Sequence, residues 1–166
     1  MTTTLLLTLV IVVVIVALVG TLLISAANRL DRLHVRTDAC WAALDSALAR
    51  RAVVARTVAA SGTAGERADL RGGADRAEAA PRAEREAEEN ELTRLLSAVD
   101  RRMLPVNLAD ELADAEYRVV IARRVHNDAV RDTLALRRRR KVRYFRLAGS
   151  ARPPEYFEIA EPEAQD

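Results

Sequence analysis

The side chains that could carry out chemistry in this chain are few and well separated. There is one cysteine, Cys40, and there are two histidines, His34 and His126, with no Asp or Glu pattern of metal-ligand spacing around them. Catalysis needs acid, base or nucleophilic groups that converge, whereas these groups are isolated. We therefore expect no enzymatic activity, no metal, no cofactor and no small-molecule substrate. Cys40 and His126 are expected to be core residues, the histidine neutral and hydrogen-bonded.

Two further polar segments lack the spacing that ligand sites require. Residues 61–73, SGTAGERADLRGG, are rich in glycine but contain no lysine and follow no strand, which excludes a phosphate-binding loop. This composition is typical of a loop that ends a helix. Residues 84–91, EREAEENE, lack the turns and ligand spacing of a calcium loop, so they predict a solvated helix face.

The strongest charge cluster is RRRRK, residues 137–141. Its members are Arg137, Arg138, Arg139, Arg140 and Lys141. A cluster of this kind attracts phosphate, in nucleic acid or in lipid head groups. Its alternative role is to complement the dipole at the end of a helix. The chain as a whole has 26 basic and 24 acidic residues, so net charge alone indicates no polyanionic partner.

The element that organises the chain is the uncharged apolar stretch from Leu5 to Ile24. As a helix its 20 residues extend about 30 Å, the thickness of the hydrocarbon core of a bilayer. In lipid an isolated segment must satisfy its own backbone hydrogen bonds, which a helix does. The sequence therefore predicts a transmembrane helix over residues 5–27 after a short non-cytoplasmic leader, residues 1–4, and the lipid bilayer is the partner of this helix.

The charges that flank the stretch predict the orientation of the protein. Arg29, Arg32 and Arg36 follow the stretch, whereas no basic side chain precedes it, so we expect the bulk of the chain in the cytoplasm. A cleaved signal peptide is the competing interpretation, because residues 25–27, Ser-Ala-Ala, are typical of a cleavage site. The apolar run exceeds the roughly 7–15 residues of a signal sequence, which favours a single-pass protein of the inner (plasma) membrane.

Residues 28–149 are expected to form a cytoplasmic helical bundle. Aromatic residues are scarce, at 4%, and long stretches lack Gly and Pro, which favours helices over strands. Apolar residues recur every three or four positions, the period of a buried helix face. The predicted fold is all-α: an N-terminal transmembrane helix that continues into a long antiparallel three- or four-helix bundle. The cytoplasmic helices are predicted over residues 28–60, 74–103 and 108–141, with Pro81 of the second either at a helix start or making a kink.

Three helices that alternate in direction would place residues 137–141 at the end of the bundle away from the membrane. That distance exceeds a Debye length of about 8 Å, so we expect no contact between this cluster and lipid. The last 17 residues, 150–166, form a tail, of which residues 150–159 are expected to dock on the bundle. Tyr156 and Phe157 are then candidate interaction residues, either docked on the bundle itself or presented to a partner.

Three stretches occur in the order of a known family. They are LDRLHVRTDACWAALDSALARR (30–51), AEYRVVIARRVHNDAVRD (115–132) and PPEYFE (153–158). Together they resemble the LemA family of single-pass bacterial membrane proteins. His126 stands where that family usually has Tyr, so the chain is similar to a divergent member. The resemblance implies an N-terminal anchor, a long helical bundle and a cytoplasmic body, and it implies no settled biochemical activity.

These observations favour a non-enzymatic, membrane-anchored helical scaffold or adaptor of LemA type. Its partner is expected to be a protein, or a second copy of the chain through self-association. The alternative function is a membrane-tethered module that binds nucleic acid or another polyanion through residues 137–141. That alternative is less favoured, because the cluster matches no known nucleic-acid-binding motif.

Overall fold

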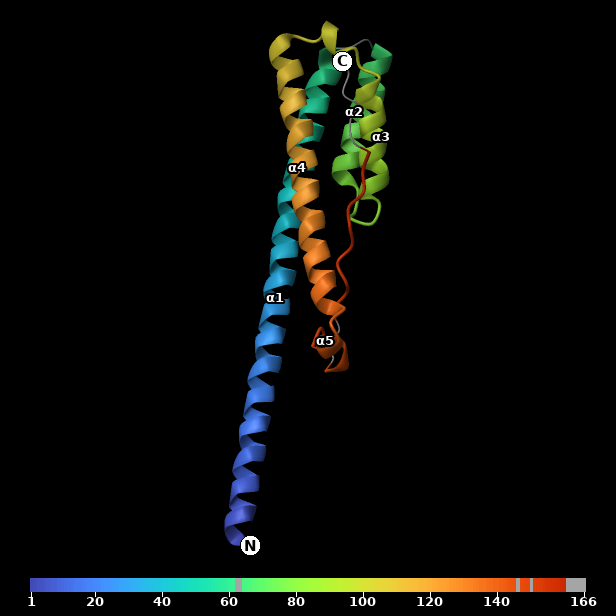
Figure 1. Cartoon of the computed structure of the whole chain (residues 1–166). Helices are drawn as coiled ribbons and strands as arrows, with labels where there is room; N and C mark the ends of the chain where they lie inside the picture. The colour runs from blue at the N-terminus through green and yellow to red at the C-terminus, as the bar shows by residue number, and fades with distance from the viewer. Residues whose placement is uncertain (62–63, 146, 150, 161–166) are drawn as a thin grey trace. The chain divides into compact units, whose positions relative to one another are not determined.

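A computed structural model describes residues 1–61, 64–145, 147–149 and 151–160, and all regular structure in these residues is helical (Figure 1). This confirms the all-α prediction, with a long apolar N-terminal helix that continues into a helical bundle. The elements are α1 (Thr2–Ser61), α2 (Ala64–Ala79), α3 (Arg85–Ser97), the 3-10 turn η1 (Arg101–Met103), α4 (Val106–Arg137) and α5 (Arg140–Tyr144).

The chain divides into two compact units, and α1 and α4 contribute residues to both. Unit 1 comprises Met1–Thr37 and Ala129–Pro154. Unit 2 comprises Asp38–Asp128 and Glu155–Asp166. Each unit therefore joins segments that lie far apart in the sequence.

Unit 1 begins with the apolar part of α1. Among the described residues, α1 is the one helix that is long and apolar enough to cross a membrane, and the apolar side chains of this part are exposed. Its threonine hydroxyls are hydrogen-bonded to backbone carbonyls of the same helix: Thr8 Oγ1 donates to the Thr4 carbonyl at 2.6 Å, and Thr21 Oγ1 donates to the Leu18 carbonyl at 2.9 Å. These bonds leave no hydroxyl unpaired along the apolar stretch.

A small apolar core follows in unit 1. Leu30 of α1 is buried together with Leu136 of α4 and Val142 of α5. Leu33, Leu147 and Ala148 pack against these three residues. The core therefore holds α5 and the end of α4 against the part of α1 that comes directly after the apolar stretch.

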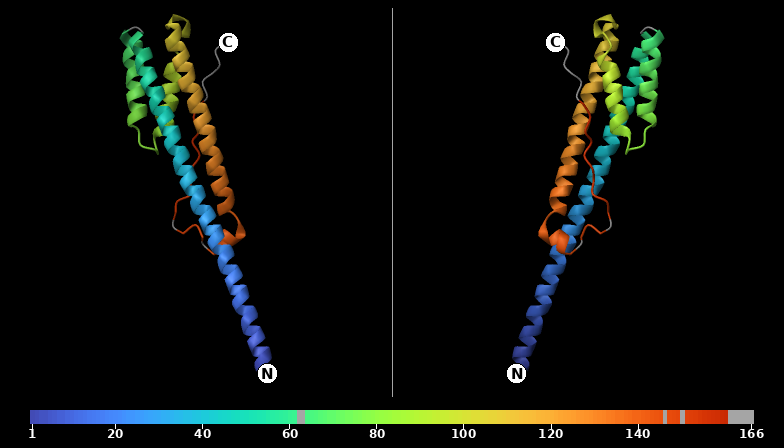
Figure 2. Two further views of the ribbon diagram at one scale, coloured as in Figure 1. Left: turned by 90° about the vertical axis from the view of Figure 1, so that its left-hand side faces the viewer. Right: turned by 90° about the vertical axis from the view of Figure 1, so that its right-hand side faces the viewer.

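Unit 2 is an antiparallel bundle of four helical segments, in which α2 and α3 lie beside the last part of α1 and the first part of α4 (Figures 1 and 2). Every segment contributes to one apolar core, as the heptad pattern predicted for α1 and α4. The core contains Ala52, Val54, Ala55, Val58 and Ala59 of α1, Leu70, Ala74 and Ala77 of α2, Leu92 and Leu96 of α3, and Leu108, Leu112 and Ala115 of α4.

The predicted loop over residues 61–73 is wrong, because α2 begins at Ala64 and includes both of its last glycines. Gly73 permits close packing of two helices: a Cβ atom at this position would lie 2.5 Å from Leu95 Cδ1 of α3. Glycine at this position is therefore explained by a contact between two helices and not by a turn, a distinction that composition alone does not make. Residues 62–63 lie outside the described residues.

The predicted second helix, residues 74–103, is also wrong in length, because it is divided at Pro81. Helix α2 ends at Ala79, and the Glu84 N–H donates to the Pro81 carbonyl at 2.9 Å in the turn before α3. Proline lacks the N–H that a continuous helix would need. The division replaces one long helix with two of 16 and 13 residues, so the bundle reverses direction once more than a three-helix bundle does.

Candidate functional site

A groove of unit 2 binds residues 155–160 as an extended segment. We call this the tail groove; its apolar wall is formed by Trp41, Leu44 and Leu48 of α1 and by Val119 and Ala122 of α4. Phe157 and Ile159 enter it, with 3% and 9% of their surfaces exposed. Successive side chains of an extended segment point to opposite sides, which explains why residues two apart are the buried ones.

The centre of the groove is aromatic. Phe157 meets the Trp41 ring edge to face, with centroids 5.6 Å apart, and His126 meets the same ring at 5.5 Å. The guanidinium of Arg82 lies 3.9 Å over the Trp41 ring, a cation–π contact. Side chains of α4 and of the turn before α3 therefore converge with the segment on one indole, which makes Trp41 the residue around which the groove is built.

Side chains of α3 and α4 bond to the backbone of the segment. The amide of Asn127 makes two bonds to Phe157: its Oδ1 accepts from the Phe157 N–H at 2.9 Å, and its Nδ2 donates to the Phe157 carbonyl at 3.1 Å. Glu86 accepts from the Glu158 N–H and Asn90 accepts from the Ala160 N–H, both at 2.8 Å. These contacts supply hydrogen bonds to the backbone of the segment, as a neighbouring strand does in a sheet.

The two candidate aromatic residues of the tail lie in different surroundings. Phe157 is buried, whereas Tyr156 keeps 43% of its surface exposed. The backbone-binding residues Glu86, Asn90 and Asn127 were not singled out from the sequence. Asparagine is a poor helix former, so Asn90 and Asn127 inside predicted helices were a signal of tertiary contacts.

His126 is fully buried and lies beside the start of the segment. Its Nε2 lies 3.3 Å from the Glu155 carbonyl, at hydrogen-bond distance in the tautomer that protonates Nε2. This contact, with the Trp41 ring, gives His126 a structural role in holding the start of the segment.

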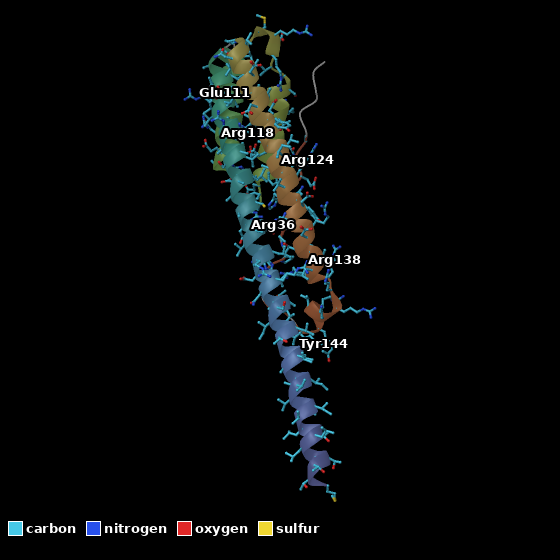
Figure 3. All side chains as sticks on the ribbon, turned by 60° about the vertical axis from the view of Figure 1, so that its left-hand side comes forward. Arg36, Glu111, Arg118, Arg124, Arg138 and Tyr144 are labelled. Atoms are coloured by element: carbon cyan, nitrogen blue, oxygen red, sulfur yellow. The ribbon has the colours of Figure 1, made fainter. Side chains whose placement is uncertain are left out.

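The basic cluster at residues 137–141 lies in unit 1, at the end of α4 and in α5. The prediction that it is remote from the residues after the apolar stretch is wrong, because the division at Pro81 adds a reversal and α4 returns to pack beside Leu30. In Figure 3 Arg138 lies at the end of α4, and Tyr144 lies further toward the apolar end of α1 than Arg36 does.

Arg137 differs from the other members of the cluster. It is half-buried, its Nη2 donates to the Ala151 carbonyl at 2.8 Å, and its Nη1 lies 3.2 Å from His34 Nε2. Arg138, Arg139, Arg140 and Lys141 are exposed, as is Arg143 beyond them. Among the residues that the structure describes, no carboxylate is paired with any of these five side chains.

A buried ion pair crosses the core of unit 2. Arg51 and Glu89 are 1% and 0% exposed and meet at 2.5 Å, and Arg51 also donates to Thr93 Oγ1 at 3.1 Å. Arg85 joins Glu89 at 3.1 Å and reaches Asp45 at 3.2 Å. The prediction that residues 84–91 form a solvated face is therefore wrong at Glu89, which neutralises Arg51.

Unit 2 also contains a cavity of about 590 Å³, lined mainly by apolar side chains such as Leu70, Leu95 and Met103. Arg94 lies at its edge and donates two hydrogen bonds to Glu91, which hold the pKa of Glu91 below its ordinary value. No His or Cys lines the cavity. In the described part of the chain, no group of three or more His, Cys, Asp or Glu side chains is arranged to hold a metal ion.

Comparisons of the chain with protein-family models, with curated proteins and with solved structures find no match.

Proposed function

We propose that the protein is a membrane-anchored helical scaffold or adaptor of the LemA type, without catalytic activity, whose tail groove binds an extended polypeptide segment. The segment belongs to a partner protein or to a second copy of the chain. The observation that supports this proposal is how the groove holds residues 155–160: polar side chains bond to the backbone, while the apolar wall takes Phe157 and Ile159. Backbone bonds suit any extended peptide, and the apolar wall selects large side chains two residues apart.

In this proposal residues 5–27 of α1 cross the inner (plasma) membrane once, and the remaining chain is cytoplasmic. The exposed residues Arg29, Arg32 and Arg36 support this orientation by the positive-inside rule. A reporter that is active only outside the cytoplasm, fused after Asp166, is expected to be silent. Activity of that reporter would contradict the orientation and leave the groove argument untouched.

The peptide-binding role is tested with a labelled peptide, PPEYFEIA, the sequence of residues 153–160. The full chain in detergent micelles is titrated into the peptide, and binding is followed by fluorescence polarisation. The tail of the parent chain competes with the peptide at an effective concentration near millimolar. Phe157→Ala weakens the binding of the chain's own tail to the groove, so this variant is expected to bind the added peptide at least about tenfold more tightly than the parent does.

Two controls distinguish specific binding of the peptide from a non-specific effect of destabilising the protein. Tyr156→Ala changes the neighbouring, half-exposed ring and is expected to bind the peptide as the parent does. A peptide with Ala in place of its Phe is expected to bind none of the proteins. If the Phe157→Ala chain does not bind PPEYFEIA, the groove is internal packing alone, and the adaptor proposal loses its support.

A further inference from the structure

Unit 1 differs sharply from the rest of the chain in charge. By sequence it carries 12 basic residues and 2 acidic ones, Asp31 and Asp132, a net charge of +10, although the whole chain has a net charge of only +2. Asp132 is already paired with Arg36 at 3.3 Å. The excess positive charge of unit 1 therefore has little compensation within the unit.

Much of this charge lies on one short segment that also exposes aromatic rings. We call it the basic face: Arg138, Arg139, Arg140, Lys141, Arg143, Tyr144 and Phe145. Tyr144 is 83% exposed and Phe145 46% exposed, and the two rings pack edge to face with centroids 5.0 Å apart. Exposed rings leave apolar surface in contact with water, whereas at a membrane interface such rings sit at the level of the head groups.

The small core of unit 1 determines where this face lies along α1. Val142, between the basic residues, is 1% exposed and packs with Leu30, which is 2% exposed. Leu30 comes six residues after Ile24, a rise of about 9 Å along a helix. The head-group layer of one leaflet is about 5–8 Å thick, and an arginine side chain reaches several ångströms further. The basic face is thus within reach of phosphate groups when Leu5–Ile24 spans the bilayer.

We propose that the basic face is a second membrane contact, which binds anionic phospholipid head groups in the leaflet from which α1 emerges. The guanidinium and ammonium groups contact phosphates, while Tyr144 and Phe145 enter the interface beside them. Anionic lipid is favoured over nucleic acid because the face is held next to the residues that leave the membrane. The site belongs to unit 1 and uses no residue of the tail groove.

The test uses the full chain in vesicles of two compositions, phosphatidylcholine alone and phosphatidylcholine with about 30% phosphatidylglycerol. A nitroxide is attached to cysteine in Tyr144→Cys, in a Cys40→Ser background, and its collisions with a water-soluble nickel complex are measured. A second label, in Met103→Cys of unit 2, serves as the control, because Met103 is 82% exposed, almost the same as Tyr144.

Collisions at position 144 are expected to fall at least about threefold when phosphatidylglycerol is present, and to recover in high salt, which screens the charges. Collisions at position 103 are expected to stay the same. The fall at position 144 should disappear in a variant with five exposed basic residues changed to Gln: Arg138, Arg139, Arg140, Lys141 and Arg143. It should persist in a matched variant with five exposed arginines of unit 2 changed to Gln: Arg50, Arg71, Arg94, Arg102 and Arg118.

Three results would overturn the proposal. Equal collisions at position 144 in the two lipid compositions would show that anionic head groups are not bound. Shielding that persists in the first five-residue variant would come from packing within unit 1. If that variant instead loses binding to single-stranded RNA while its response to phosphatidylglycerol is unchanged, the face is a nucleic-acid site.

Discussion

The buried polar groups of the two units differ in kind. In the described part of unit 1 they are two hydroxyls, those of Thr37 and Thr133, whereas in unit 2 they include the ions Arg51, Arg85 and Glu89. By sequence, unit 2 carries 14 basic and 22 acidic residues, while unit 1 carries 12 and 2. A buried cation needs a carboxylate partner, and only unit 2 has carboxylates in number. The comparison suggests that unit 1 keeps its cations at the surface, where lipid phosphates can neutralise them.

The largest expected effect is the loss of one partner from the buried ion pair of unit 2. Glu89→Leu leaves Arg51 buried without a carboxylate and removes one of the two carboxylate partners of Arg85, which should lower the free energy of unfolding by roughly 3–5 kcal/mol. Chemical unfolding of the full chain in detergent, followed by fluorescence, measures this in unit 2, because Trp41 is the single tryptophan and lies there.

The matched controls for this prediction are chosen by burial. Glu111→Gln removes an exposed ion pair with Arg50, in which the Glu111 side chain is 48% exposed, and should change the free energy of unfolding by less than about 1 kcal/mol. The double variant Arg51→Met, Glu89→Leu removes both charges of the pair and should recover part of the loss, because Arg85 still lacks Glu89 and keeps only Asp45 as its partner. If Glu89→Leu lowers the free energy of unfolding no more than Glu111→Gln does, burial does not distinguish the two kinds of ion pair.

The next effect concerns the tail groove. Phe157→Ala removes a buried ring and should cost roughly 2–3 kcal/mol of stability, somewhat less than in a closed core because the segment can leave the groove. Tyr156→Ala removes a half-exposed ring and should cost less than about 1 kcal/mol. Equal melting of the Phe157→Ala variant and the parent would show that the segment contributes nothing to the stability of unit 2.

The sequence was sufficient for those features that depend on the period of apolar residues. Along α4 the period of three and four residues predicts one buried face, and seven of its eight members are buried while Ala122 is partly buried: Leu112, Ala115, Val119, Ala122, His126, Ala129, Thr133 and Leu136. Periodicity identifies such a face because helical side chains return to the same side every three or four residues.

The remaining features depend on contacts between residues far apart in the chain. Gly73 looks like part of a loop until Leu95 is seen against it, and Glu89 looks like part of a solvated run until Arg51 is seen beside it. The extra helix, by contrast, comes from the local break at Pro81, and it changed the position of the basic cluster. The residues of the tail groove that bind backbone could not be paired with their targets, because neither spacing nor composition encodes a contact across about 30 or 70 positions.

A smaller effect is expected from the buried hydroxyls of unit 1. Thr37 Oγ1 and Thr133 Oγ1 lie 3.0 Å apart, and each also lies within hydrogen-bond distance of a carbonyl one turn earlier in its own helix. Each hydroxyl has one proton, so one of them donates to the other hydroxyl while the second donates to its carbonyl. Thr133→Val should lower the free energy of unfolding of unit 1 by about 1 kcal/mol, because it leaves the Thr37 hydroxyl without its partner. The double variant Thr37→Val, Thr133→Val should lower it by little more, because both members of the pair are then apolar. Hydrogen exchange in α1 and α4 of unit 1 measures the effect. Costs that simply add would show that the two hydroxyls do not interact.

The smallest effect concerns an exposed ion pair of unit 2. The Arg118 guanidinium bonds to Asp114 at 2.7 Å and holds the pKa of Asp114 below its ordinary value. A carboxyl group whose pKa is lowered by folding stabilises the native state above its ordinary pKa, and this contribution is lost as the pH falls through the lowered value. Asp114→Asn should therefore melt slightly below the parent at neutral pH, and the two should converge in acid, at pH values below the lowered pKa of Asp114, where both side chains are uncharged. Salt should narrow the gap at neutral pH, because both groups face solvent. The buried pair of Arg51 and Glu89, in contrast, should keep its effect on stability in high salt. If the difference in melting temperature between Asp114→Asn and the parent is the same at neutral and acidic pH, the substitution changes the stability of the helix itself and not the charge interaction.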